Sequence, residues 1–213
     1  MNTEQTTLLQ GMLAHFLGSA ANAGAKCHAD QIAAFVASVA QPWSRATLEG
    51  HLTASAWVLD RSGTHAALIH HRKLDRWLQP GGHIEVDDVS WRAAAEREVV
   101  EETGLRHFLV TGEEHRLFDV DVHLIPARPD VPEHVHYDLR FLFVAQAAAS
   151  GEPIATINPG EAHEGRWFSL TTLANDSTLD PSLQRMVTRS LDSWPQLQLM
   201  ICGLKDALFT GYT

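Results

Sequence analysis

Residues 97–105 of the chain read Arg97-Glu98-Val99-Val100-Glu101-Glu102-Thr103-Gly104-Leu105. At about 100° per residue, an α-helix places Glu98, Glu101 and Glu102 on one face. Like charges at this spacing destabilise a helix by a few tenths of a kcal/mol per pair, and the helix dipole adds to the penalty near the C-terminal end. We therefore expect a bound cation to compensate these three carboxylates.

Carboxylate oxygens gathered on one face are the ligands that Mg²⁺ and Mn²⁺ prefer, and both ions also accept phosphate oxygens. The sequence therefore predicts Glu98, Glu101 and Glu102 as ligands of Mg²⁺ or Mn²⁺. For an isolated run of glutamates the alternative is an acidic face in contact with solvent. Here the run is not isolated, because it follows Gly81-Gly82 by 15 residues and ends on Gly104.

The flanking residues predict a helix from about Ser90 to Thr103. Ser90 is suited to cap its N-terminus, and Gly104 can end it in a left-handed conformation. Its opposite side carries apolar residues that we expect in the core, namely Trp91, Ala95 and Val99. The helix is thus expected to be anchored on one side and acidic on the other.

The first 45 residues are predicted to form a helical hairpin. Apolar residues recur at helical spacing in 8–17 and again in 32–39. Gly24 is expected to separate the two helices, with Asp30 as the N-cap of the second and Pro42 beyond its end. The hairpin is expected to pack on the core or to form a dimer contact.

The remaining pattern favours strands on both sides of the central helix. Short strand-like runs occupy 52–59, 65–70, 83–86, 116–125, 137–147 and 165–170, and an amphipathic helix is predicted for 181–191. A turn at 60–63 and a proline-rich loop at 126–132 separate neighbouring strands. This order indicates a mixed α/β or α+β sandwich.

Composition excludes several classes of protein. Of 213 residues, 45% are hydrophobic and 20% charged, as in soluble globular proteins. No apolar run approaches the roughly 20 residues of a membrane span, and the N-terminus lacks a basic secretory start, so we expect a cytoplasmic protein. The net charge of −10 disfavours binding to nucleic acid polymers. The two cysteines, Cys27 and Cys202, match no zinc or redox spacing.

The chain resembles the Nudix family. The box of that family reads Gly, five residues, Glu, seven residues, then Arg-Glu-apolar-x-Glu-Glu-x-Gly-apolar, and residues 97–105 match each defined position of its second half. Residues 79–85 resemble the entry strand and loop of the family. One departure precedes the helix: Asp88 stands in place of the Glu, and eight residues rather than seven separate it from Arg97. We interpret this as a one-residue insertion before Ser90.

The resemblance implies roles for individual residues. Glu98, Glu101 and Glu102 would be metal ligands, the backbone carbonyl of Gly82 another, and Arg97 would orient a catalytic carboxylate. Members of the family often carry a further Glu in a loop before an aromatic strand, as a ligand or base. Two residues of this chain fit that position, Glu161 first and Glu164 second. The proton of the attacking water would pass to Glu101 or to Glu161.

Two further groups are candidates for substrate contacts. His134, His136 and Asp138 share one face of a strand, where they would contact phosphate or ribose, or form a structural hydrogen-bonded corner. Arg76 and Trp77 precede the Gly-Gly turn, where they would line a leaving-group pocket, or act as a surface cation and a core aromatic residue.

The resemblance implies an α/β/α sandwich with a mixed sheet, plus the N-terminal helical hairpin. The expected division is a helical extension at 1–48, a Nudix domain at 49–175 and a C-terminal helical segment at 176–213 packed on the core. The implied function is Mg²⁺- or Mn²⁺-dependent hydrolysis of a phosphoanhydride bond in a nucleoside diphosphate-linked or related small molecule, by a water that the metal activates. The protein would work without a membrane and as a possible homodimer.

Two alternatives remain. One is a Nudix module that binds nucleotides without turnover, which the altered loop before Ser90 favours and the complete glutamate set disfavours. The other is an isomerase acting on a prenyl diphosphate. That chemistry usually requires a cysteine in the pocket, and neither Cys27 nor Cys202 falls in the predicted core.

Overall fold

The computed structural model describes residues 3–18, 22–109, 116–146, 154 and 162–209. Its contacts divide the chain into two compact units. The first consists of Met1–Ala56, Gly81–Val99 and His115–Phe141, and the second of Trp57–Pro80, Val100–Glu114 and Leu142–Thr213. One helix and two strands contribute residues to both units.

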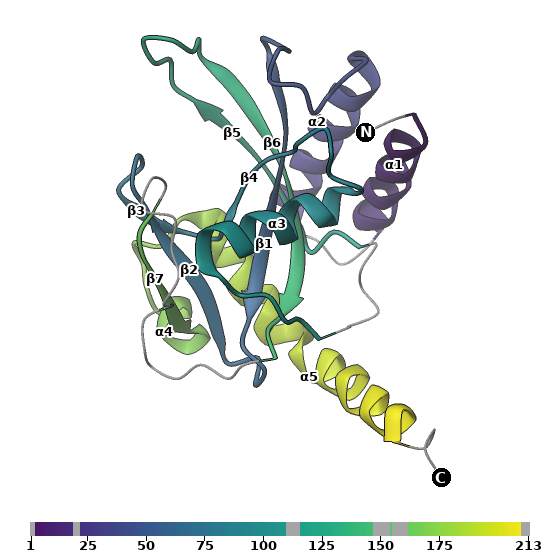
Figure 1. Cartoon of the computed structure of the whole chain (residues 1–213), viewed down its shortest axis with the longest axis vertical. Coiled ribbons are helices and arrows are strands. Elements are labelled where there is room, and N and C mark those ends of the chain that lie inside the picture. Colours follow the sequence, from purple (N-terminus) through teal and green to yellow (C-terminus); the bar gives the residue numbers. More distant parts are fainter. Residues whose placement is uncertain (1–2, 19–21, 110–115, 147–153, 155–161, 210–213) are drawn as a thin grey trace. The chain divides into compact units, whose positions relative to one another are not determined.

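The described residues form the helices and strands labelled in Figure 1. The helices are α1 (Thr3–Gly18), α2 (Ala23–Ser38), α3 (Trp91–Thr103), α4 (Leu170–Ala174) and α5 (Pro181–Phe209). The strands are β1 (Gly50–Leu59), β2 (His65–His71), β3 (Arg76–Leu78), β4 (Gly81–His83), β5 (Asp119–Ile125), β6 (His134–Val144) and β7 (Ala162–Ser169). The predicted mixed α+β fold with an N-terminal helical hairpin is confirmed.

In the first unit, the strands follow the order β4-β1-β6-β5. Strand β4 pairs antiparallel with β1, with Thr53 opposite His83. Strands β5 and β6 form a continuous antiparallel ladder and run side by side as a long arm in Figure 1. Helix α2 packs on β5, and its Phe35 ring stacks on Tyr137 of β6 at a centroid distance of 4.1 Å.

The predicted start of the second helix is wrong. Helix α2 begins at Ala23, and the side chain of Asn22 caps it by accepting a hydrogen bond of 2.9 Å from the Ala25 N–H. Asp30 therefore lies in the middle of the helix and not at its start. Alanines at 23, 25 and 29 have high helix propensity, and Gly24 falls in the first turn, so the helix extends further toward the N-terminus than the apolar spacing indicated.

The predicted ends of the central helix are confirmed. The Ser90 hydroxyl accepts a hydrogen bond of 3.0 Å from the Ala93 N–H at the start of α3. At the other end, Gly104 has φ 68° and its N–H donates to the Val100 carbonyl at 3.0 Å. The side chains expected in the core are buried, namely Trp91, Ala95 and Val99. Local sequence therefore sets both the length and the orientation of α3.

Strand β4 differs from its prediction, which was 83–86. It consists of Gly81–His83 because two glycines allow it to lie very close to β1. A Cβ atom at Gly81 would overlap the side chain of Ser55 and lie 2.6 Å from its Cα. Only glycine permits this approach, so the Gly-Gly pair is part of the strand and not a turn before it.

In the second unit, β2 pairs antiparallel with β3, with β7 and with the end of β1. The predicted turn between β1 and β2 is closed by Asp60, whose carboxylate accepts hydrogen bonds from the backbone N–H groups of 62, 64 and 65. The indole N–H of Trp57 donates to the hydroxyl of Ser190 in α5 at 2.7 Å. This bond fixes α5 to β1, and the helix itself runs to Phe209, beyond the predicted 181–191.

Among the helices of the described residues, none combines the length and the apolar character that crossing a bilayer requires. The expected division into an extension, a central domain and a C-terminal segment stays a prediction.

Candidate active site

The three predicted ligands on α3 differ in burial. Glu98 and Glu102 are 8% and 3% exposed, whereas Glu101 is exposed. The two buried residues are one helical turn apart, so their side chains lie on the same face. Buried carboxylates are stable only when cations or hydrogen-bond donors lie beside them. This face of α3 is therefore suited to hold a cation.

Glu98 lies directly against the backbone of β4. A Cβ atom at Gly82 would lie 2.7 Å from its Oε1 and 2.8 Å from its Oε2. The carboxylate thus occupies the space that any other side chain at this position would need. The contact brings a predicted carboxylate ligand beside the glycine whose carbonyl is a predicted ligand.

Arg97 connects this carboxylate to the loop before α3. Its Nη1 donates to Glu98 Oε1 at 2.9 Å, and its Nη2 donates to the His83 carbonyl at 2.8 Å. Its Nε and Nη2 also donate to the two oxygens of Asp88, at 3.1 and 3.0 Å. The hydrogen bonds with Asp88 are the main reason why the pKa of Arg97 is raised further above its ordinary value. Arg97 therefore fixes Glu98 in orientation.

Asp88 has a structural partner that sequence counting did not reveal. Besides Arg97, its carboxylate accepts a hydrogen bond of 2.7 Å from the Glu85 N–H, which closes the loop between β4 and α3. Val89, in the same loop, is exposed, and its carbonyl accepts a hydrogen bond of 2.7 Å from the Gln5 side chain of α1. Both hydrogen bonds hold the loop in which the sequence analysis places the inserted residue, and the insertion itself stays a prediction.

The candidates before and on β7 have different outcomes. Glu161 lies outside the described residues, so its role stays a prediction. Glu164 lies on β7 and accepts hydrogen bonds from Arg166, the shorter at 2.8 Å.

Arg76 and Trp77 make contacts within the second unit. Arg76 is exposed and lies 3.6 Å from the carboxylate of Asp180. Trp77 meets Phe168 edge-on at a centroid distance of 4.7 Å, and the Arg166 guanidinium lies 5.7 Å from its ring centre. These contacts give both residues a structural role, and their predicted contact with substrate stays a prediction.

His134 and His136 share a face of β6 as expected, with their Nε2 atoms 3.2 Å apart. Two more histidines join them through strand pairing, His51 of β1 and His83 of β4. The ring centroid of His136 lies 4.8 Å from that of His51 and 5.4 Å from that of His83. Burial and then the neighbouring imidazoles lower the pKa of His51 to about 4 and that of His136 to about 2. Sequence reasoning placed His134 and His136 together but missed His51 and His83, because only the pairing of β1, β4 and β6 brings all four into one group.

A buried ionic network lies on β5 and β6. Arg140 lies within ion-pair distance of Asp138 at 2.9 Å, Asp119 at 3.2 Å and Asp121 at 3.3 Å. Burial acts to lower the pKa of Arg140, but the three carboxylates, Asp138 foremost, raise it overall. Asp138 also accepts hydrogen bonds from Thr53 and Ser55 at 3.0 and 2.7 Å. The network joins β1, β5 and β6 within the first unit.

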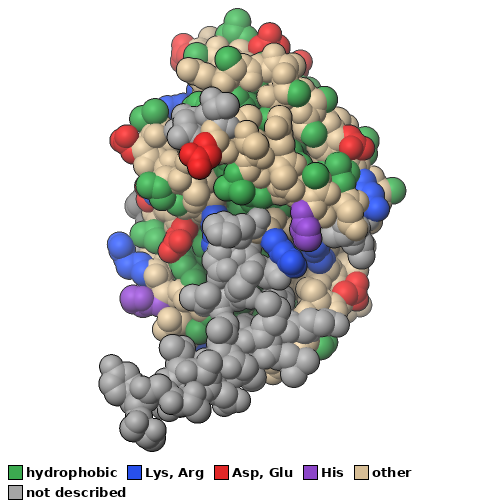
Figure 2. Space-filling model, turned by 90° about the vertical axis from the view of Figure 1, so that its right-hand side faces the viewer, with side chains coloured by type: hydrophobic (Ala, Val, Ile, Leu, Met, Phe, Trp, Pro, Cys, Tyr) green, Lys and Arg blue, Asp and Glu red, His purple; other side chains and the backbone are tan. Residues whose placement is uncertain are grey.

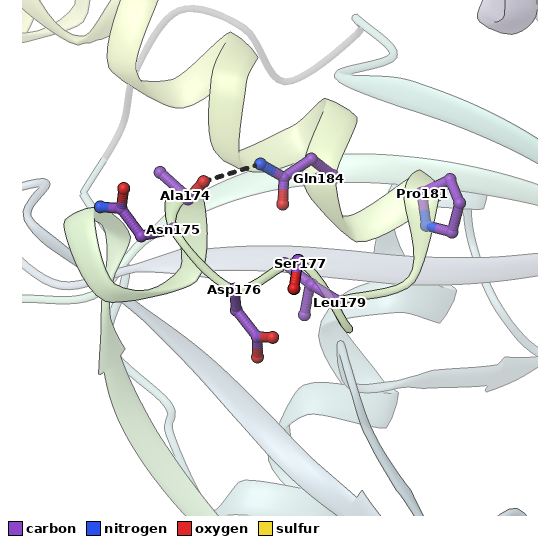
Figure 3. Close-up of a pocket in the computed structure, with 7 residues that line it drawn as sticks. All are labelled: Ala174, Asn175, Asp176, Ser177, Leu179, Pro181 and Gln184. Atoms are coloured by element: carbon purple, nitrogen blue, oxygen red, sulfur yellow. Dashed lines mark hydrogen bonds between the residues drawn. The ribbon is translucent and has the colours of Figure 1, made fainter.

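A surface pocket in the second unit contains none of the predicted site residues (Figure 3). Seven residues line it: Ala174, Asn175, Asp176, Ser177, Leu179, Pro181 and Gln184. Gln184 spans it with a hydrogen bond of 3.2 Å to the Ala174 carbonyl. The face shown in Figure 2 carries its coloured acidic side chains singly and not in one patch. Neither feature competes with α3 as the candidate site.

Comparison with known proteins adds independent findings. A sequence profile of the NUDIX domain matches residues 50–189. Among solved structures, a NUDIX-family hydrolase from Clostridium perfringens is 22% identical, with a TM-score of 0.46 over 67% of this chain and 96% of that one. A MutT protein from Methanosarcina mazei Go1 is 20% identical, with a TM-score of 0.43 over 73% and 98% of the two chains. A C. elegans Ap4A hydrolase in a binary complex is 12% identical, with a TM-score of 0.43 over 68% and 97%.

No curated protein matches the sequence significantly. The profile match covers more than half of the chain and contains the Gly-Gly pair, all of α3 and all seven strands from β1 to β7. This match confirms the family that the helix motif at 97–105 indicates. The chain belongs to the NUDIX family.

Proposed function

We propose that this NUDIX hydrolase cleaves a phosphoanhydride bond in a nucleoside diphosphate-linked or related small molecule, using Mg²⁺ or Mn²⁺. The ligands would be Glu98, Glu101, Glu102 and the backbone carbonyl of Gly82. The observation that carries this proposal is the buried Glu98 carboxylate, which lies against Gly82 where a Cβ atom would otherwise be. All four are hard oxygen donors, as these two ions require.

Individual residues would have different roles in the proposed reaction. When bound, a divalent ion at this site would offset the charge of the phosphates and acidify the attacking water. Arg97 holds Glu98 in one orientation, and Asp88 in turn holds Arg97. The proton of the water would pass to Glu101, which is exposed, or to Glu161.

We assign the choice of substrate, and not cleavage, to Arg76 and Trp77 in the second unit and to the face of β6 that carries His134 and His136 in the first. The formal charge of −10 supports small-molecule substrates over nucleic acid polymers. A cytoplasmic location and a homodimer formed through the N-terminal hairpin are further parts of the proposal.

A hydrolysis screen tests the proposal. The panel contains nucleotide sugars, dinucleotides, and ordinary and oxidised nucleoside triphosphates, each with Mg²⁺, with Mn²⁺ and with EDTA. We expect at least one class to be cleaved at its phosphoanhydride, with activity lost in EDTA and restored by added metal. If calorimetry shows nucleotide binding while no member of the panel is cleaved, the protein is a binding module and the proposal is wrong.

Alanine substitutions at Gly81 and Gly82 distinguish the roles of these two adjacent glycines. Gly82→Ala is expected to displace the Glu98 carboxylate, because the new Cβ atom would lie 2.7 Å from its Oε1. A misplacement of about 1 Å at a reacting site can lower the rate on the order of 100-fold, so we expect kcat/KM to fall by about that factor. The free energy of unfolding should change little, since a carboxylate at the end of a flexible side chain can move.

The control is Gly81→Ala, whose Cβ atom meets the side chain and backbone of Ser55. We expect it to lower the free energy of unfolding by about 1–3 kcal/mol, as overpacking usually does. Urea denaturation and steady-state kinetics on both variants measure the contrast. Full activity in the Gly82→Ala variant would show that the reaction does not need Glu98 in the position it has against Gly82.

A further inference from the structure

Three imidazoles from three strands converge in the first unit. They belong to His51 of β1, His83 of β4 and His136 of β6, and we call them the histidine cluster. One ring nitrogen from each lies within 4.8 Å of those of the other two. His134 extends the group, with its Nε2 3.2 Å from that of His136.

The histidine cluster lies on the face of β4 opposite Glu98. His83 pairs with Thr53 and Gly82 with Ala54, so the side-chain positions of 82 and 83 point to opposite faces. The Cβ direction of Gly82 points at Glu98. His83 therefore points away from Glu98, to the face that His51 shares with Thr53. The cluster and the Glu98 carboxylate flank the strand on its two sides.

The most buried member of the cluster is His51. It is 4% exposed, and among the described residues neither its Nδ1 nor its Nε2 has a hydrogen-bond partner. Leaving buried polar atoms without partners is costly, and native structures rarely contain them. A ligand that accepts a nitrogen lone pair would satisfy one of these two nitrogens. A metal ion coordinated by neutral imidazoles is such a ligand.

The charges on the same face favour a cation. In the β5–β6 ladder, His136 pairs with His123, and Asp138 with Asp121. Within the buried network around Arg140, three carboxylates face one guanidinium, which leaves an excess of negative charge close to the cluster. His123 also lies 3.3 Å from an oxygen of Asp121.

We propose that His51, His83 and His136 bind Zn²⁺ at a second metal site, separate from the glutamates of α3, with His134 or a water as the fourth ligand. Imidazole suits Zn²⁺, whereas Mg²⁺ prefers oxygen. Four ligands about 2.0–2.1 Å from a tetrahedral ion are roughly 3.4 Å from one another. The three ring nitrogens lie within 4.8 Å of one another, so movements of about 1 Å in their side chains would bring them to that spacing. The ion would tie β4 to β1 and β6, and so steady the strand that precedes the loop before α3. This assigns His136 to a metal ion and not to direct contact with the substrate.

Binding measurements on the full chain, stripped of metal with chelator, test this site. Equilibrium dialysis with Zn²⁺ should give one tightly held ion per chain. His83→Asn and His136→Gln should each weaken Zn²⁺ binding by at least about tenfold, and the double variant should abolish it. The matched control is His107→Gln, an exposed histidine outside the cluster, which should bind as the parent does. Tight binding retained by the double variant would overturn the proposal.

Two further measurements distinguish the histidine site from the proposed hydrolytic centre. The Glu102→Gln variant should bind Zn²⁺ as tightly as the parent protein but bind Mn²⁺ more weakly. X-ray absorption at the zinc edge of the parent protein, which needs no folded variant, should show nitrogen ligands at about 2.0–2.1 Å with the scattering pattern of imidazole. An ion surrounded by oxygen alone, or an equal loss of Zn²⁺ and Mn²⁺ in Glu102→Gln, would refute a histidine site.

Discussion

The Glu102→Gln variant is expected to lose hydrolysis by a factor on the order of 100 or more, because it removes one charged oxygen ligand from the centre that stabilises the phosphates. Glu98→Gln should lose at least as much, since it also removes the negative charge from the ion pair with Arg97. Glutamine has the shape of glutamate, so α3 should keep its packing. Steady-state kinetics on the substrate found in the screen measure kcat/KM, and calorimetry measures the affinity for Mn²⁺.

Glu96→Gln is the matched control for these two variants. Glu96 is an exposed acid on the same helix, about 200° around the axis from Glu98. Its loss changes the net charge of the chain by the same amount but leaves the acidic face intact. Its activity and Mn²⁺ affinity should equal those of the parent protein. The mechanism is excluded if Glu98→Gln and Glu102→Gln also behave like the parent.

The Arg140→Met variant is expected to lower the free energy of unfolding by about 3–5 kcal/mol. Arg140 is 2% exposed and lies between three buried carboxylates. Removing the cation leaves Asp119, Asp121 and Asp138 to repel one another in a region that excludes water. Methionine fills a similar volume, so the effect reports mainly on charge. Urea denaturation followed by circular dichroism measures the change.

Arg166→Met provides the comparison. Arg166 forms a hydrogen-bonded ion pair with Glu164, but its side chain is exposed to solvent. Exposed pairs of this kind contribute about 0–1 kcal/mol. A loss in Arg140→Met no greater than that in Arg166→Met would mean that the buried network does not stabilise the first unit.

Features set by neighbouring residues were predictable from the sequence. The N-cap at Ser90, the left-handed Gly104 and the buried side of α3 each follow from the residue type and its spacing. Arg97 was predicted to hold a carboxylate, and its hydrogen bond to Glu98 supports that role without testing it. The start of the second helix was predicted wrongly because Asn22 caps it ten residues before the apolar pattern begins at Ile32.

Features that depend on strand pairing were not predictable. The histidine cluster needs β1, β4 and β6 in register, and its members are separated by up to 85 residues in sequence. The network around Arg140 left a local signal, since Asp119, Asp121 and His123 alternate along β5. Alternation shows which side chains share a face, but it cannot show that the polar face is buried. The two hydrogen bonds between Arg97 and Asp88 were not predicted. Counting along the motif treats Asp88 only as a substitute for Glu.

Anomalous diffraction from a crystal of the protein soaked in Mn²⁺ tests the central claim most directly. We predict a manganese peak within about 2.5 Å of carboxylate oxygens from Glu98 and Glu102 and of the Gly82 carbonyl. A crystal saturated with Mn²⁺ but without a peak at these oxygens would contradict the account.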